Sequence, residues 1–212
     1  MSIKITSNDF VLQNFDTSEE VRDLLNKYDA FLEALSSEHY GFQRAAAKAA
    51  LQFFFSKQYS SLSDLASANY DANDTLKSIS ASRQEYLKNI PLKEKKACSI
   101  DLATGTGKSF VMFGVAMILL AEKLVDRVLV LCPSLTIEEE LTKKFKSLTS
   151  DHLLCCTLQE VQPGFVLPEI INANETILPN QICIENIHAT YDRTGSSIET
   201  LEIGRASCRE RV

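Results

Sequence analysis

The residues with the clearest chemical meaning are A-T-G-T-G-K-S, at positions 103–109. Glycines at 105 and 107 let the main chain fold tightly around an anion, with its N–H groups pointing inward. A helix that begins here would add the partial positive charge of its N-terminus. The Lys108 ammonium group can reach the β- and γ-phosphates of a nucleotide as a catalytic cation, and the Ser109 hydroxyl suits one coordination position of Mg²⁺. We therefore predict an ATP- and Mg²⁺-binding loop that consists of Thr104, Gly105, Thr106, Gly107, Lys108 and Ser109.

This loop departs from the strict phosphate-loop pattern G-x-x-x-x-G-K-[ST], because Leu102 occupies the position of its first glycine. The departure argues against many phosphate-loop families but not against the helicase-type ones. At average residue usage, G-x-G-K-[ST] occurs by chance in under about one in a hundred chains of this length. The alternative interpretation is a glycine-rich turn that only caps a helix.

The segments around the loop alternate between short apolar runs and helices. Continuous apolar runs are typical of strands buried on both faces, and this alternation favours a parallel sheet with helices on both faces. The predicted strands are 97–102 and 127–132, with weaker candidates at 153–157 and 181–184. The predicted helices are 108–123 and about 137–148. The predicted fold class is therefore α/β, with the loop between a strand and a helix, as a phosphate loop requires.

Residues 1–95 are predicted to form a helical N-terminal region that precedes an incomplete α/β domain at 96–201. T-x-x-E at 17–20 is a capping-box pattern, and apolar residues follow it at helical spacing as far as Leu35. Further helical segments are predicted at about 42–57, within 58–80, and between Ser82 and Pro91.

Charge and composition limit what the chain can do. It has 22 Lys and Arg against 28 Asp and Glu, a formal net charge of −6. Such an acidic chain does not suit nucleic-acid binding over its whole surface, although a local DNA groove remains open.

The longest nearly apolar run, 110–121, is too short to cross a membrane and no signal peptide is visible, so we expect a cytoplasmic protein. Five of the six cysteines lie in or beside apolar runs without metal-ligand spacing, which indicates buried thiols: Cys98, Cys132, Cys155, Cys156 and Cys183.

The last residues, 202–212, differ from the rest of the chain. They read E-I-G-R-A-S-C-R-E-R-V, with three Arg and no apolar periodicity. The string resembles the translation of a common sequencing adapter, and a short natural basic tail is the alternative. We exclude it from fold reasoning and expect that the natural reading frame was cut near Leu201, so that the chain is the front part of a longer protein.

Four segments, in order along residues 40–200, resemble those of superfamily 2 (DEAD/DEAH-box-like) helicases. I-D-L-A-T-G-T-G-K-S-F at 100–110 is similar to motif I of restriction-enzyme motor subunits, and R-V-L-V-L-C-P-S-L-T-I at 127–137 is similar to motif Ia. Y-G-F-Q-R-A-A at 40–46 resembles the aromatic–Gln element upstream of motif I. I-C-I-E-N-I-H-A-T-Y at 182–191 resembles the segment before motif II in type III restriction enzyme res subunits. The resemblance implies a RecA-like fold and an ATP-dependent DNA translocase or helicase, usually joined to a nuclease domain and working with a modification (methyltransferase) subunit.

The resemblance also implies roles for single residues. Gln43 would hydrogen-bond the adenine edge, which a carboxamide can do through its donor and acceptor groups; an ordinary glutamine on a helix surface is the alternative. Contacts to DNA phosphates would come from Pro133, Ser134 and Thr136 after the second strand, and from Asn186, His188 and Thr190 after a later strand. Simple helix capping by Ser134 and a packed or capping role for His188 are the alternatives.

The acidic motif of these helicases is missing. Residues 1–201 contain no D-E-x-[DH], and no adjacent Asp-Glu pair occurs anywhere in the chain. Phosphoryl transfer needs acidic groups that hold Mg²⁺ and orient water, together with arginines that the family carries in a second lobe. We therefore expect the parent protein to hydrolyse ATP and the 212-residue chain to bind nucleotide at most. Two other functions stay open: a phosphate-loop kinase or other small-molecule NTPase, and a non-catalytic nucleotide- or DNA-binding fragment.

Overall fold

The computed structural model describes residues 18–36, 40–90, 96–172 and 176–187. Within the chain there are two compact units. One unit consists of Met1–Arg22 and Gln52–Cys98, and the other, called the sheet unit below, consists of Asp23–Leu51 and Ser99–Val212. The sheet unit contains the predicted phosphate loop. Residues 23–51 therefore belong with this loop despite their distance from it along the chain.

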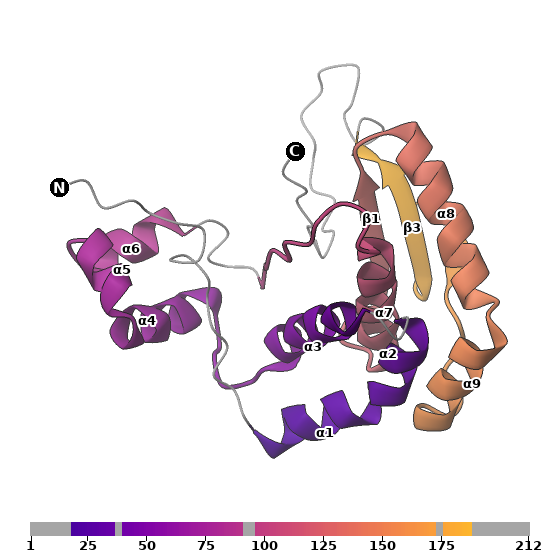
Figure 1. The fold of residues 1–212 in the computed structure, drawn as a ribbon, viewed down its shortest axis with the longest axis horizontal. Coiled ribbons are helices and arrows are strands. Elements are labelled where there is room, and N and C mark those ends of the chain that lie inside the picture. The colour runs from indigo at the N-terminus through magenta and orange to yellow at the C-terminus, as the bar shows by residue number, and fades with distance from the viewer. Residues whose placement is uncertain (1–17, 37–39, 91–95, 173–175, 188–212) are drawn as a thin grey trace. The chain divides into compact units, whose positions relative to one another are not determined.

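Three parallel strands form the sheet in the described part of this unit (Figure 1). Their order across the sheet is β1 (Val128–Cys132), β3 (Gln181–Asn186) and β2 (Glu169–Ile171). Val130 of β1 pairs with Ile184 of β3, the central strand, in which Ile182, Cys183 and Ile184 are buried. The α/β fold class with a parallel sheet is confirmed, and so are the strands predicted at 127–132 and 181–184.

Helix α8 (Leu135–Thr149) runs along the sheet and contacts all three strands (Figure 1). Its Phe145 is fully buried and meets the ring of Phe113 edge-on, with 5.2 Å between the ring centroids. Phe113 belongs to α7 (Lys108–Ala121), which is buried along most of its length. Burial of each phenyl ring contributes roughly 1.5–3 kcal/mol. The contact therefore fixes α7, the helix that begins at the phosphate loop, against α8.

The first two helices of the chain depart from the predicted pattern at one point. A single helix was predicted as far as Leu35, but the chain has α1 (Glu19–Lys27) and α2 (Asp29–Leu35), separated by Tyr28 with φ −97° and ψ 8°. Tyr28 is fully buried, and its hydroxyl donates a hydrogen bond of 2.5 Å to Glu122. α2 then packs against α9 (His152–Val161).

Two predicted strands are wrong. Residues 97–102 are irregular and none of their side chains is buried. An apolar run becomes a strand only when its main-chain groups pair with a neighbour, and no described strand pairs with this segment. Residues 153–157 belong to helix α9 instead. Asp151 caps that helix by accepting a hydrogen bond from the Leu154 N–H at 3.0 Å, and Leu154 and Leu158 are buried one helical turn apart.

The cysteine prediction is wrong for three of the five described thiols. Cys132 and Cys183 are buried in strands, whereas Cys98, Cys155 and Cys156 are partly exposed. Cys155 and Cys156 belong to helix α9, whose buried residues are Leu154 and Leu158, so both thiols lie beside the buried face and not in it. Among the described residues, no helix is long and apolar enough to cross a membrane.

The other unit contains α4 (Leu62–Ala72), α5 (Asp74–Ile79) and α6 (Arg83–Asn89). Each helix begins at a polar side chain that accepts a main-chain N–H: Ser61, Asn73 and Ser82. The small core of the unit consists of Ala66, Leu76 and Tyr86. The ring of Tyr70 stacks on that of Tyr86 at 5.7 Å. The helix start predicted at Ser82 is confirmed, and the capping box at 17–20 lies partly outside the described residues.

A polar cluster joins the ends of three helices in the sheet unit. Lys27 donates to Glu122 at 2.7 Å and to Gln162 at 2.8 Å, and Tyr28 donates to the same Glu122 carboxylate. Burial raises the pKa of the Tyr28 hydroxyl. Burial also acts to raise the pKa of Glu122, but the hydrogen bonds from Lys27 and Tyr28 and the lysine charge outweigh it, so that pKa lies below its ordinary value of about 4.5. The cluster therefore stabilises the ionised carboxylate.

Replacing Glu122 by glutamine is expected to lower the free energy of unfolding by about 1 kcal/mol at neutral pH, a value discounted for partial exposure. Because the folded pKa is depressed, the contribution is fully present above pH 4.5 and is lost as the pH falls through the folded value. Urea unfolding from pH 7 to pH 3 measures this difference. Glu160→Gln, an exposed change on α9, is the matched control. A Glu122→Gln difference that stays constant across this range would contradict the prediction.

Candidate phosphate-binding site

The loop before α7 is a tight turn followed directly by the helix. The Thr106 N–H donates to the Ala103 carbonyl at 3.3 Å, and the Thr106 hydroxyl donates to the same oxygen at 2.6 Å. Gly105 occupies the third position of this turn with φ +80°. Type II turns need glycine there, because other residues are strained at positive φ. The chain between Ala103 and Thr106 is therefore folded back on itself.

Gly107 completes the loop in the left-handed conformation, with φ 77° and ψ 37°, and occupies the cap position of α7. No side chain caps this helix, and its first turn has no acidic residue. The Phe110 N–H donates to the Gly107 carbonyl at 2.9 Å, which starts the helix. The helix N-terminus is thus a region of partial positive charge next to Lys108 and Ser109.

All six residues predicted to bind phosphate lie together, in this turn and at the start of α7. Thr104 and Gly105 are exposed, and the next four residues, 106–109, are partly exposed. The loop and the first two residues of α7 are not covered by the core. An anion can therefore reach the main-chain N–H groups, the lysine and the serine hydroxyl from solvent.

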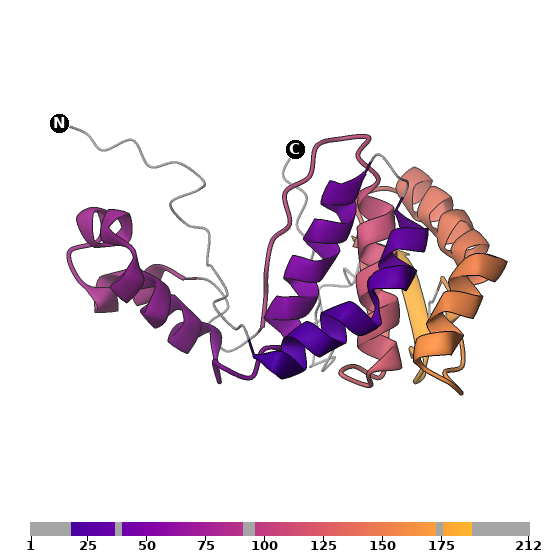
Figure 2. The same cartoon turned by 60° about the horizontal axis from the view of Figure 1, so that its bottom comes forward.

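Gln43 meets this loop from α3 (Gly41–Phe55), which lies beside α7 (Figure 2). Its Nε2 donates to the Thr106 carbonyl at 2.5 Å. The side chain is only 4% exposed, and its Oε1 is buried with no hydrogen-bond partner among the described residues. The structure therefore brings Gln43 and the loop together, and encloses the carboxamide instead of presenting it to solvent.

One cation near the loop was not found from the sequence. The Lys144 ammonium group of α8 lies 3.9 Å from the centroid of the Phe110 ring, in a cation–π contact. Phe110 is in the first turn of α7. Lys144 gives no motif signal, because it is one of several lysines in a predicted helix and only the packing of α7 on α8 selects it.

Four of the residues predicted to contact DNA are described, and they lie at or just after the carboxyl ends of β1 and β3. Cys132 and Asn186 end the two strands and are paired in register, so these two strand ends lie at one edge of the sheet. The Ser134 hydroxyl caps α8 by accepting from the Ile137 N–H at 3.4 Å, and Pro133 and Thr136 are exposed. Asn186 itself is 4% exposed. His188 and Thr190, also predicted to contact DNA, lie outside the described residues.

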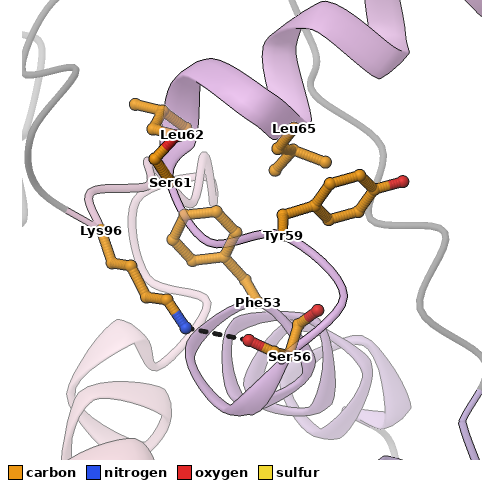
Figure 3. Close-up of a pocket in the computed structure, with 7 residues that line it drawn as sticks. All are labelled: Phe53, Ser56, Tyr59, Ser61, Leu62, Leu65 and Lys96. Carbon is orange, nitrogen blue, oxygen red and sulfur yellow. Dashed lines mark hydrogen bonds between the residues drawn. The ribbon is translucent and has the colours of Figure 1, made fainter.

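A second group of polar atoms, in the other unit, lines a small and mainly apolar pocket (Figure 3). Lys96 points at the end of α3 and donates to the carbonyls of Phe54 and Ser56, at 2.9 Å each. Burial lowers the pKa of Lys96. A lysine that binds the last carbonyls of a helix compensates their partial negative charge. We therefore interpret this group as a structural helix cap.

Comparisons with known proteins complete the description of the site. Neither curated proteins nor solved structures give a match. The model of the family "Type III restriction enzyme, res subunit" matches residues 42–203, which is well over half of the chain. The match includes Gln43, the loop and all three strands, and it confirms the resemblance drawn from the motifs. The chain therefore belongs to the type III restriction enzyme res-subunit family, a family of ATP-dependent, helicase-like motors.

Proposed function

We propose that residues 104–109 bind the triphosphate of ATP with Mg²⁺. One observation carries the proposal: a turn with two glycines at positive φ leads directly into the uncapped N-terminus of α7, beside Lys108. Folded main chain of this kind presents N–H groups to an anion, and the lysine adds a full positive charge. A turn that only caps a helix would not need a lysine and a serine at the first two helical positions.

The residues of the loop fit a magnesium nucleotide. A side chain at position 105 would meet nothing within 4 Å, so there is open space beside the turn. No cluster of three or more His, Cys, Asp or Glu side chains in the described ranges suits a metal ion. Mg²⁺ bound to a nucleotide takes several of its ligands from phosphates and water, so that one hydroxyl, that of Ser109, is a sufficient protein ligand here.

We propose that the complete motor couples ATP hydrolysis to movement on DNA and works with a modification subunit. Family membership supports this wider function. Exposed Pro133 and Thr136 and the N-terminus of α8 would contact DNA phosphates without a basic surface. The chain has no adjacent Asp-Glu pair. We therefore propose nucleotide binding without turnover as the activity of the 212 residues themselves.

Competition binding tests the proposal. A fluorescent ATP analogue is titrated onto the 212-residue chain with Mg²⁺, and ATP, inorganic tripolyphosphate or adenosine is then added. We expect ATP and tripolyphosphate to displace the analogue and adenosine to fail, because the loop recognises phosphate. Displacement by adenosine and none by tripolyphosphate would contradict the proposal. A second titration with duplex DNA, repeated at rising salt, tests the phosphate contacts, since binding through phosphates weakens as salt rises.

A further inference from the structure

We infer that Lys144 of α8 is a second cation of the proposed phosphate site, where it attracts the triphosphate across the ring of Phe110. The inference rests on the proposed function. It adds to Lys108 a positive charge that comes from a different helix, and it makes Phe110 the positioning residue that holds this charge.

The first argument is the place of the ammonium group. The Lys144 Nζ atom lies 3.9 Å from the centroid of the Phe110 ring. The same ring reaches the loop, because its Cδ2 atom would lie 3.0 Å from a Cβ atom placed at Gly107. Gly107 is the cap residue of α7, where the helix presents its N–H groups. A single aromatic ring therefore separates the ammonium group from the residue at which the helix begins.

The second argument is that no acidic side chain neutralises this charge. Within the described ranges, Lys144 forms no ion pair with a carboxylate. Glu140 precedes it by one helical turn, a spacing that favours a Glu–Lys pair, yet the lysine lies on the ring of Phe110 instead. The first turn of α7 has no acidic residue either. Positive charge on Lys108, on Lys144 and at the helix N-terminus is therefore of one sign in one region, which favours a bound anion.

The third argument is that the packing of two helices fixes the position of Lys144. The next residue, Phe145, is fully buried and meets the ring of Phe113 on α7 at 5.2 Å. This contact holds the main chain of α8 against α7, and the ring of Phe110 then holds the ammonium group by a cation–π contact. A charge that is already held in place loses less entropy when a ligand binds than one that must first be ordered.

The experiment titrates tripolyphosphate with Mg²⁺ onto the 212-residue chain at two salt concentrations. Lys144→Met removes the charge and keeps the length of the side chain. We expect its affinity to fall roughly 2- to 5-fold at about 0.02 M potassium chloride and to equal that of wild type at about 0.5 M, because salt screens charges that act through space. Lys143→Met is the matched control, since it removes the same charge from the neighbouring exposed position, and we expect it to bind as wild type does. Lys144→Arg keeps both the charge and the stacking on the ring, so we expect it to bind as wild type does.

A double-mutant cycle tests the role of Phe110. In a Phe110→Leu background the ammonium group has no aromatic ring to hold it. We therefore expect Lys144→Met to change the affinity at low salt by less than about twofold in that background. Urea unfolding of each variant shows whether a change in stability accounts for a change in affinity.

Several results would overturn the inference. Equal affinities of wild type and Lys144→Met at low salt would exclude this charge from the site, and a loss that is the same at both salt concentrations would assign Lys144 a structural role. An unchanged effect of Lys144→Met in the Phe110→Leu background would show that the ring does not hold the ammonium group. Failure of the proposed function is distinct: the wild-type chain would then not bind tripolyphosphate at either salt concentration, and both proposals would be wrong.

Discussion

Replacing Lys108 by alanine is expected to weaken the binding of ATP and of tripolyphosphate by roughly 10- to 150-fold. Hydrogen bonds made by a charged group contribute about 1.5–3 kcal/mol, and each 1.4 kcal/mol is a tenfold change in affinity. Lys108 is the first residue of α7 and is partly exposed, so its removal opens no cavity in the core. Equilibrium titration with Mg²⁺ measures the effect, and urea unfolding checks that stability is kept.

Two further variants separate the position of the charge from its mere presence. Lys143→Ala removes the same charge from an exposed position on α8, and its affinity is expected to equal that of wild type. Lys108→Arg keeps the charge but changes its shape and reach, so an intermediate affinity is expected. If Lys108→Ala binds tripolyphosphate as wild type does, the loop does not hold phosphate through this lysine.

The parts of the fold that followed from the sequence are those with a strong local signal. The run at 128–132 is continuously apolar, the segments on either side of it are long enough for helices, and Ser82 marks a helix start by its own hydrogen bond. The segment 97–102 is also rich in apolar residues, although Ser99 and Asp101 interrupt them, and it has no partner strand in the described structure. A strand is a property of two segments, so one apolar run cannot establish it.

In the candidate site, too, some features could be predicted from the sequence and others could not. The loop residues were found because they are adjacent in the chain and their types suit one chemistry. The contact between Gln43 and Thr106 depends on how α3 meets the loop, and the contact of Lys144 with Phe110 depends on how α8 packs on α7. Neither the contact of α3 with the loop nor the packing of α8 on α7 follows from a local sequence pattern. The burial of Gln43 in particular could not be predicted from its position in a motif.

Replacing Gly107 by alanine is expected to lower both stability and phosphate affinity. At φ +77° an alanine costs about 1–2 kcal/mol, and crowding against Gln43 and Phe110 adds about 1–3 kcal/mol. If the side chains move to admit the methyl group, Gln43 leaves the Thr106 carbonyl and the loop loses its orientation. Urea unfolding gives the free energy of unfolding, and tripolyphosphate titration gives the affinity.

Two other glycines allow main-chain strain at positive φ to be separated from the crowding of the added methyl group against Gln43 and Phe110. Gly105 and Gly164 have φ of +80° and +82°, and a Cβ at either position would meet nothing within 4 Å. Alanine at either is expected to cost only the backbone term of about 1–2 kcal/mol, and Gly164→Ala, outside the loop, should leave phosphate affinity unchanged. A larger stability loss at Gly107 than at Gly105 would then measure the packing of Gln43 and Phe110 against the loop. Equal losses at the two positions would mean that these side chains yield freely, and that they do not hold the loop in the orientation that phosphate binding requires.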